Sequence, residues 1–257
     1  MSLTPLLGFA YRNWLVVRRN VFTLFELLFW PFFGMAAVGI LASAADLSEA
    51  FLAVLLTGAI AVSVLQVAQI DVAYVLLFDA WGKSLKHTFL APVEARHYVA
   101  GAWLVGALRG LAVFAGLALF AAAAFGLDLG RPGAAGWGLF LAGLLLDAAA
   151  LGALTCALLL LFGLRAEVAA WSLSLLMVFL SGFYAPASAY PGLLYDLSRA
   201  LPTSHLLEYI RGFYGGSPGD IALGLGLSLL LLLLSGLALR GATERAKRTG
   251  MVLKLSE

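Results

Sequence analysis

The stretch FLAVLLTGAIAVSVLQVAQIDVAYVLL, Phe51 to Leu77, decides the fold because it is apolar over almost its whole length. An α-helix of about 20 apolar residues crosses the ~30 Å hydrocarbon core of a bilayer, and this stretch is longer than that. Backbone groups in hydrocarbon must be paired internally, which only helices and closed barrels achieve. Leu, Ala and Gly dominate the stretch and no strand-like alternation occurs, so we predict a membrane-spanning helix.

The composition of the whole chain agrees with this stretch. Of the 257 residues, 63% are hydrophobic and 12% are charged, and the mean hydropathy is +0.99. Soluble domains carry about 25% charged residues. We therefore predict an all-α integral membrane protein that forms a single domain over residues 1–257. The predicted spans are Val21 to Ala44, Phe51 to Leu77, Val99 to Phe125, Ala134 to Leu164, Val168 to Tyr184 and Ile221 to Leu239.

The distribution of Lys and Arg predicts the orientation, because these residues accumulate on the cytoplasmic side. With the amino terminus inside, most of them fall in cytoplasmic segments. Only Arg131, Arg199 and Arg211 then fall in the outer segments. We expect both termini in the cytoplasm and a location in the plasma (inner) membrane.

Three segments outside the spans have distinct patterns. Residues 3–20 place apolar side chains at helical spacing, which predicts an amphipathic interfacial helix. Residues 78–98 form a basic cytoplasmic loop, and residues 185–219 form an outer hairpin of two short helices cut by prolines. Candidate site residues of the hairpin and the end of the span before it are Tyr184, Pro186, Pro191, Pro202, His205 and Arg211.

Ionisable residues inside predicted spans are candidates for a functional role, since such groups are costly in a membrane. Glu26 and Asp71 lie near cytoplasmic ends, where they can snorkel or pair locally. Arg109 and Asp147 lie deeper and at comparable depths, so we predict that they pair. The pair would either lock the bundle or take part in gating or substrate passage.

No nucleotide, metal or catalytic motif is evident. Trp81 to Ser84 reads WGKS, but a Walker A loop needs G-x-x-x-x-G-K-[ST], and Leu77 stands where the first Gly belongs. The three His residues have no Cys or carboxylate ligands at metal-binding spacing. We expect no enzyme activity and no cofactor in this chain.

Two stretches resemble the membrane subunit of ABC-2 type exporters. FLAPVEARHYVAGAWLVGALRG, Phe89 to Gly110, is similar to the L-[AS]-P-[VI] element of that family, followed by a Gly and an Arg-Gly pair in the next span. FLSGFYAPASAYPGLLYDLSRALPTSHLLEYIRGFYGG, Phe179 to Gly216, is similar to its S-G-x-[FY]-x-P, P, L-P-x-[ST]-H and R signature. The second stretch looks closest to the branch that exports drugs and lipo-oligosaccharides.

The resemblance implies a permease that works as a homodimer or heterodimer with two copies of a separate P-loop ATPase, which would hold ATP and Mg²⁺. The cytoplasmic loop would then form a coupling helix that seats in the ATPase. This sequence departs from the family at Lys86 and His87, near which members often carry Glu. Apolar spans suit an amphipathic or lipid-linked substrate such as a drug, lipid or glycan. Carried over to this chain, the coupling residues are Leu85, Lys86, His87, Leu90, Ala91, Pro92 and Val93.

Two other classes of protein stay open on the sequence. An ion-gradient-driven secondary transporter or channel ordinarily shows carboxylates or broken helices at the midplane of paired halves. A membrane enzyme requires a catalytic constellation, for which the sequence offers no motif.

Overall fold

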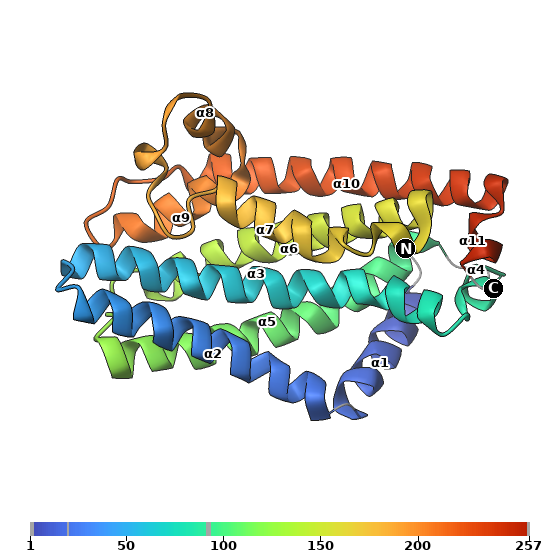
Figure 1. The fold of residues 1–257 in the computed structure, drawn as a ribbon, viewed down its shortest axis with the longest axis horizontal. Coiled ribbons are helices and arrows are strands. Elements are labelled where there is room, and N and C mark those ends of the chain that lie inside the picture. The colour runs from blue at the N-terminus through green and yellow to red at the C-terminus, as the bar shows by residue number, and fades with distance from the viewer. Residues whose placement is uncertain (1–2, 20, 91–93, 256–257) are drawn as a thin grey trace.

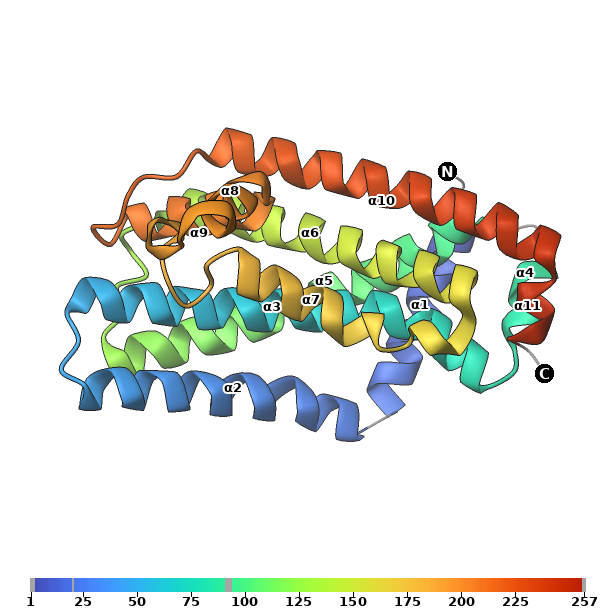
Figure 2. The ribbon, with the colours of Figure 1, turned by 45° about the horizontal axis from the view of Figure 1, so that its top comes forward.

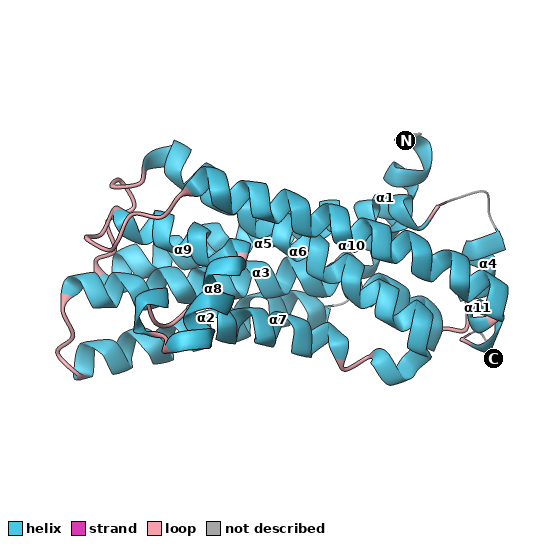
Figure 3. Ribbon diagram, turned by 90° about the horizontal axis from the view of Figure 1, so that it is seen from above, coloured by secondary structure: helices cyan, strands magenta, loops and turns pink. Residues whose placement is uncertain are grey.

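The protein is described here by a computed structural model that covers residues 3–19, 21–90 and 94–255. All regular elements within these ranges are helices, as predicted (Figure 3). The α-helices are α1 (Leu3–Arg19), α2 (Val21–Ala44), α3 (Glu49–Trp81), α4 (Leu85–Leu90), α5 (Ala95–Phe125), α6 (Gly133–Phe162), α7 (Ala169–Leu180), α8 (Gly192–Ala200), α9 (Pro202–Gly212), α10 (Ile221–Thr249) and α11 (Met251–Lys254). Two 3-10 turns lie at Gly163–Ala166 and Ala187–Ala189.

The long helices form an elongated bundle (Figures 1 and 2). Helices α2, α3, α5, α6, α7 and α10 run along its length, and α1 crosses the bundle obliquely. Helices α4 and α11 lie at one end, which we call the α4 end. Helices α8 and α9 lie toward the other end, which we call the α9 end. The charged loops and the short helices therefore lie at the two ends of the bundle.

Within the described residues, four helical segments are long and apolar enough to cross a membrane: α3, α5, Gly133–Ala166 and α10. Two shorter apolar helical segments, Phe29–Ala44 and Ala169–Leu180, run beside them. These lengths are compatible with a multi-pass membrane protein. An apolar helix of 20 residues spans about 30 Å, so α3 with its 33 residues must extend beyond the hydrocarbon.

Two spans end at places that differ from the prediction. Helix α7 ends at Leu180, before the predicted Tyr184, because Gly182 has a φ of 75° that does not continue an α-helix. Helix α10 passes the predicted end at Leu239 and continues to Thr249, so the basic tail is helical. It ends where Gly250 takes the left-handed conformation, with a φ of 70°.

The predicted outer hairpin contains two short helices, but α9 is buried rather than lying on the surface. Its side chains from Pro202 to Leu207 are inaccessible to solvent and lie against α6 and α10. Gly143 of α6 and Gly224 of α10 leave the space that the Leu206 side chain fills. The sequence pattern did not show this, because two glycines on distant helices create the site that α9 occupies.

Candidate functional site

A cavity of about 660 Å³ lies between α2, α3, α5 and α7, and we call it the polar cavity. Its volume is in the range of sites that bind small molecules. Helix α3 supplies the largest share of its wall, with one residue from α5 and aromatic residues from α2 and α7. The lining residues are Trp30, Pro31, Gly34, Met35, Ala59, Val62, Ser63, Gln66, Val67, Ile70, Asp71, Tyr74, Arg109, Trp171 and Tyr184.

A nearly buried ion pair joins two helices in the wall of the polar cavity. Arg109 Nη1 of α5 donates to Asp71 Oδ1 of α3, and the two side chains are 10% and 13% exposed. Helix α5 comes this close because Gly106 lies against the backbone of Ala68, whose carbonyl oxygen is 2.8 Å from the position a Cβ would take. The small residue in this part of α5 therefore allows the close approach expected from the sequence.

The predicted pairing of Arg109 with Asp147 is wrong. Asp147 is fully buried on α6, and its Oδ2 accepts a hydrogen bond of 3.2 Å from Thr203 Oγ1 of α9. The predicted depths of the two residues did not determine the partner of Arg109, because α5 is rotated so that Arg109 points toward α3. Asp147 instead joins α6 to the buried helix α9. The side chain of Glu26 lies outside the described residues.

The walls of the polar cavity combine aromatic surface with a few polar groups. Trp30, Tyr74, Trp171 and Tyr184 supply the aromatic surface, and Gln66 supplies an amide that makes no hydrogen bond within the described part of the chain. Apolar walls with few convergent polar groups are typical of sites for organic molecules. The cavity therefore suits an amphipathic ligand.

A second cluster of polar side chains gathers at the α4 end around the carboxylate of Asp79, the third residue from the end of α3. Tyr98 Oη and Thr88 Oγ1 donate to Asp79 Oδ2 over 2.5 and 3.0 Å. Ser84 Oγ donates to Asp79 Oδ1 over 3.0 Å, and Arg12 donates to both oxygens over 2.9 and 3.2 Å. We call these five residues the Asp79 cluster.

The Asp79 cluster joins four segments that are separate in the sequence. Arg12 lies on α1, Thr88 on α4 and Tyr98 on α5, and Ser84 precedes α4. Burial alone lowers the pKa of Arg12, but Tyr98 and Asp79 outweigh this effect and raise it. Helix α1 can reach the cluster because Gly101 of α5 has no side chain to hold it off. A displacement of α4 would therefore act on α1, α3 and α5 together.

Sequence reasoning missed Asp79. The signal that could have found it is an acidic residue at the end of an apolar run, followed by Ser84 and Thr88 in a basic segment. Its importance arises from Arg12 and Tyr98, which are distant along the chain and brought together by packing.

The predicted coupling residues lie in or beside α4. Leu85 is fully buried in an apolar cluster that also contains Val252 and Leu255, whereas His87 is exposed and Lys86 is half-exposed. Helix α4 thus has one side anchored to α11 and another side that remains accessible. The side chain of Leu90 and the residues Ala91, Pro92 and Val93 lie outside the described part of the chain.

The remaining predicted residues are spread over the segment between α7 and α10. Pro186 and Pro191 directly precede the second 3-10 turn and α8, and Pro202 is the first residue of α9, where proline fits a helix start. His205 is buried, and its Nε2 lies 2.9 Å from the Arg199 carbonyl oxygen. These residues shape the segment, and of the six predicted here only Tyr184 lines the polar cavity.

Arg211 fastens α9 to the rest of the bundle. It is 3% exposed, and its Nη1 donates to the Gly182 carbonyl over 2.8 Å. Its Nη2 donates to the carbonyls of Phe183 and Val54. Gly58 of α3 makes this contact possible, because a Cβ there would lie 1.8 Å from the Phe183 oxygen. One guanidinium therefore joins α9, the turn after α7, and α3.

We expect the Arg211→Lys variant to be less stable than the parent by about 1.5–3 kcal/mol, the contribution of one hydrogen bond to a charged group. Lysine keeps the charge but lacks the planar fork that reaches all three carbonyls. The denaturation temperature in detergent measures the effect. Arg131→Lys is the matched control, since Arg131 pairs with Asp128 at an exposed site. If the denaturation temperature falls equally in the two variants, Arg211 does not fasten α9 to the bundle in the way described.

Comparison with known proteins gives little further information. No family model matches the chain. A segment of 40 residues, 16% of the chain, is 38% identical to an uncharacterised protein of Archaeoglobus fulgidus. The match spans 62% of that protein, less than two thirds of its length. It assigns neither a family nor an activity to this chain.

Proposed function

We propose that this chain is the membrane permease subunit of an ATP-driven exporter that resembles the ABC-2 type. The observation that carries the proposal is the polar cavity, which places an ion pair and an amide among aromatic side chains in a bundle of apolar helices. Such a cavity offers a passage to an amphipathic or lipid-linked molecule, such as a drug, lipid or glycan. In this proposal the chain crosses the plasma membrane six times and both termini are cytoplasmic.

The exposed aromatic residues beside the polar cavity support a dimeric permease. Trp30 is 65% exposed and Trp171 is 49% exposed, and both line the cavity. A second copy of this chain, or a sibling permease, would cover α2 and α7 and close the cavity from that side. The cargo would then pass between two permease subunits.

The energy would come from a separate P-loop ATPase that holds ATP and Mg²⁺, because the sequence has no Walker A motif. Helix α4 is the segment that the ATPase would move. Its accessible side carries His87, and the Asp79 cluster ties α4 to α1, α3 and α5. ATP binding would close the ATPase dimer and shift the bundle between two states through different contacts in each.

The test is co-expression with a candidate P-loop ATPase subunit, followed by purification and reconstitution into liposomes. We expect the two chains to co-purify and to transport an amphipathic or lipid-linked substrate only with hydrolysable ATP. The polar cavity is tested with Gln66→Leu, which should slow transport and leave co-purification unchanged. Transport driven by an ion gradient without ATP would overturn the proposal and favour a secondary transporter.

A further inference from the structure

A groove of about 910 Å³ runs between α5 and α10, and α6 forms its floor. It shares no lining residue with the polar cavity. The groove exists because small residues line it. Ala149 and Ala153 lie on α6, and a Cβ on Gly236 of α10 would meet no atom within 4 Å. Its existence depends on the bundle alone and not on the proposed exporter function.

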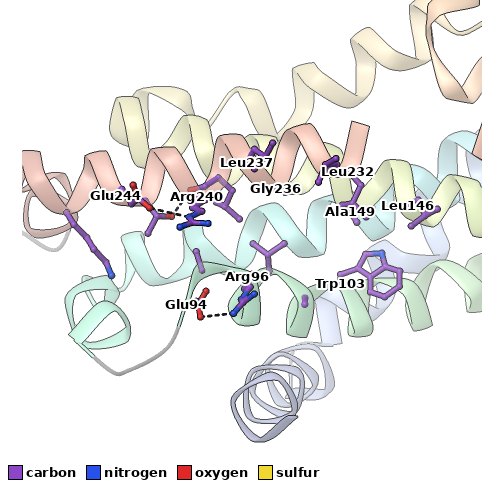
Figure 4. A pocket seen from close by; sticks show the side chains of 18 residues that line it. Glu94, Arg96, Trp103, Leu146, Ala149, Leu232, Gly236, Leu237, Arg240 and Glu244 are labelled. Atoms are coloured by element: carbon purple, nitrogen blue, oxygen red, sulfur yellow. Dashed lines mark hydrogen bonds and ion pairs between the residues drawn. The ribbon is translucent and has the colours of Figure 1, made fainter. Parts of the chain in front are cut away.

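The groove changes character along its length (Figure 4). Trp103, Leu146 and Leu232 lie at one end, and Arg96, Arg240 and Glu244 lie toward the other. The indole of Trp103 is held in place by a hydrogen bond of 2.8 Å from its Nε1 to the Leu145 carbonyl. The apolar end faces the middle of the bundle, and the charged end faces the α4 end.

The dimensions of the groove match one leaflet of a bilayer. At the helical rise of 1.5 Å per residue, Leu232 and Arg240 lie about 12 Å apart along α10, and Arg240 and Lys247 about 10 Å apart. One leaflet contributes about 15 Å of hydrocarbon and a headgroup layer of roughly 5–7 Å. The apolar part therefore has the depth of an acyl chain, and the charged part has the depth of a headgroup.

The charged rim favours an anion. Arg96, Arg240 and Lys247 line it together with Glu94 and Glu244, so cations outnumber carboxylates. Arg96 uses Nη2 for its pair with Glu94, and Arg240 uses Nε for its pair with Glu244. Because a guanidinium has five N–H donors, both arginines keep donors for a phosphate. Both ion pairs are exposed, so replacing either of them by a contact with a ligand costs little free energy.

We propose that this groove binds an anionic phospholipid from the leaflet at the α4 end. An acyl chain lies over Gly236 and Ala149 toward Trp103, and the phosphate accepts hydrogen bonds from Arg96 and Arg240. The bound lipid fills the gap between α5 and α10 and so stabilises the packing of α10 on the bundle.

The experiment uses the full chain in nanodiscs of phosphatidylcholine that contain a small fraction of phosphatidylglycerol brominated on its acyl chains. Bromine quenches nearby tryptophan fluorescence. The part of the quenching that disappears in the Trp103→Phe variant is the part that arises from lipid in the groove. We expect saturable quenching of Trp103 by brominated phosphatidylglycerol and much weaker quenching by brominated phosphatidylcholine at the same fraction.

Two variants test the two halves of the site. Arg96→Gln with Arg240→Gln should weaken phosphatidylglycerol binding by more than about ten-fold, because the loss of a single charge-assisted hydrogen bond already accounts for about that factor. Gly236→Leu should obstruct the groove where the acyl chain passes over Gly236 and so strongly reduce the Trp103 signal. Gly226→Leu is the control, because its Cβ also meets open space on α10 outside the groove.

The outcomes separate this inference from the proposed function. Equal quenching by the two lipids, or quenching unchanged in Gly236→Leu, would overturn the lipid site and leave the exporter proposal standing. A chain that fails to transport with ATP yet binds phosphatidylglycerol selectively would overturn only the exporter.

Discussion

Replacing Arg109 with Met is expected to lower the stability of the protein by about 3–5 kcal/mol, the usual loss when one partner of a buried ion pair is removed. Asp71 accepts from Arg109 through Oδ1, and its Oδ2 has no hydrogen-bond partner among the described residues. The variant would leave this carboxylate in the wall of the polar cavity without its cation. The denaturation temperature of the purified protein in detergent measures the loss.

Two further variants make this prediction specific. The double variant Arg109→Met/Asp71→Leu should recover most of the lost stability, because removing both charges of a buried pair is often nearly neutral. Arg96→Met is the control, since Arg96 pairs with Glu94 at the surface and such pairs contribute about 0–1 kcal/mol. If the single and double variants are equally unstable, Arg109 does not stabilise the protein through its ion pair with Asp71.

The apolar runs predicted the helices, because length and hydropathy alone decide whether a segment can cross hydrocarbon. They did not predict where α7 and α10 end. Helix α7 stops at a glycine with positive φ, and the charged part of α10 stays helical beyond the apolar run. Hydropathy therefore predicts the part of a helix that can lie in hydrocarbon, and it does not predict the full length of that helix.

The partners of the buried charges could not be predicted, because they depend on how each helix is rotated. Arg109 and Asp147 were predicted at similar depths, yet Arg109 faces α3 and Asp147 faces α9. The contact between Gly106 and Ala68 determines the partner of Arg109, and the burial of α9 determines the partner of Asp147. Both are properties of packing between distant segments, which no local pattern records.

The basic loop illustrates the same limit at the α4 end. The resemblance to the exporter family implied a coupling helix in this loop, and the structure contains a short helix, α4, within it. The Asp79 cluster, which holds that helix, draws Arg12 from near the amino terminus and Tyr98 from the next span. The sequence therefore locates the segment proposed to couple to the ATPase, whereas the contacts that attach this segment to the bundle are tertiary.

In the proposed exporter, replacing Asp79 with Asn is expected to uncouple ATP hydrolysis from transport. The side chain keeps its size but loses the charge that holds Arg12, so the links that join α4, α1 and α5 through this side chain weaken. Motion of α4 then passes less completely to the spans. We expect transport to fall about ten-fold, within the range of typical coupling free energies, while hydrolysis by the associated ATPase continues. The ratio of substrate moved to ATP hydrolysed in liposomes measures this effect.

A measurement without the ATPase tests the same cluster directly. In Asp79→Asn, amide hydrogen exchange across Ser84 to Leu90 should be faster than in the parent, because the hydrogen bonds from Ser84 and Thr88 to the carboxylate are weakened. The double variant Ser84→Ala/Thr88→Val removes these two bonds and leaves the buried carboxylate in place, so it should show the same direction of change with less loss of stability. Glu244→Gln is the control, since Glu244 pairs with Arg240 at an exposed position on α10 and lies outside the cluster. Unchanged exchange across α4 in Asp79→Asn would show that the carboxylate does not hold this helix, and unchanged coupling despite faster exchange would show that α4 passes its motion by another route.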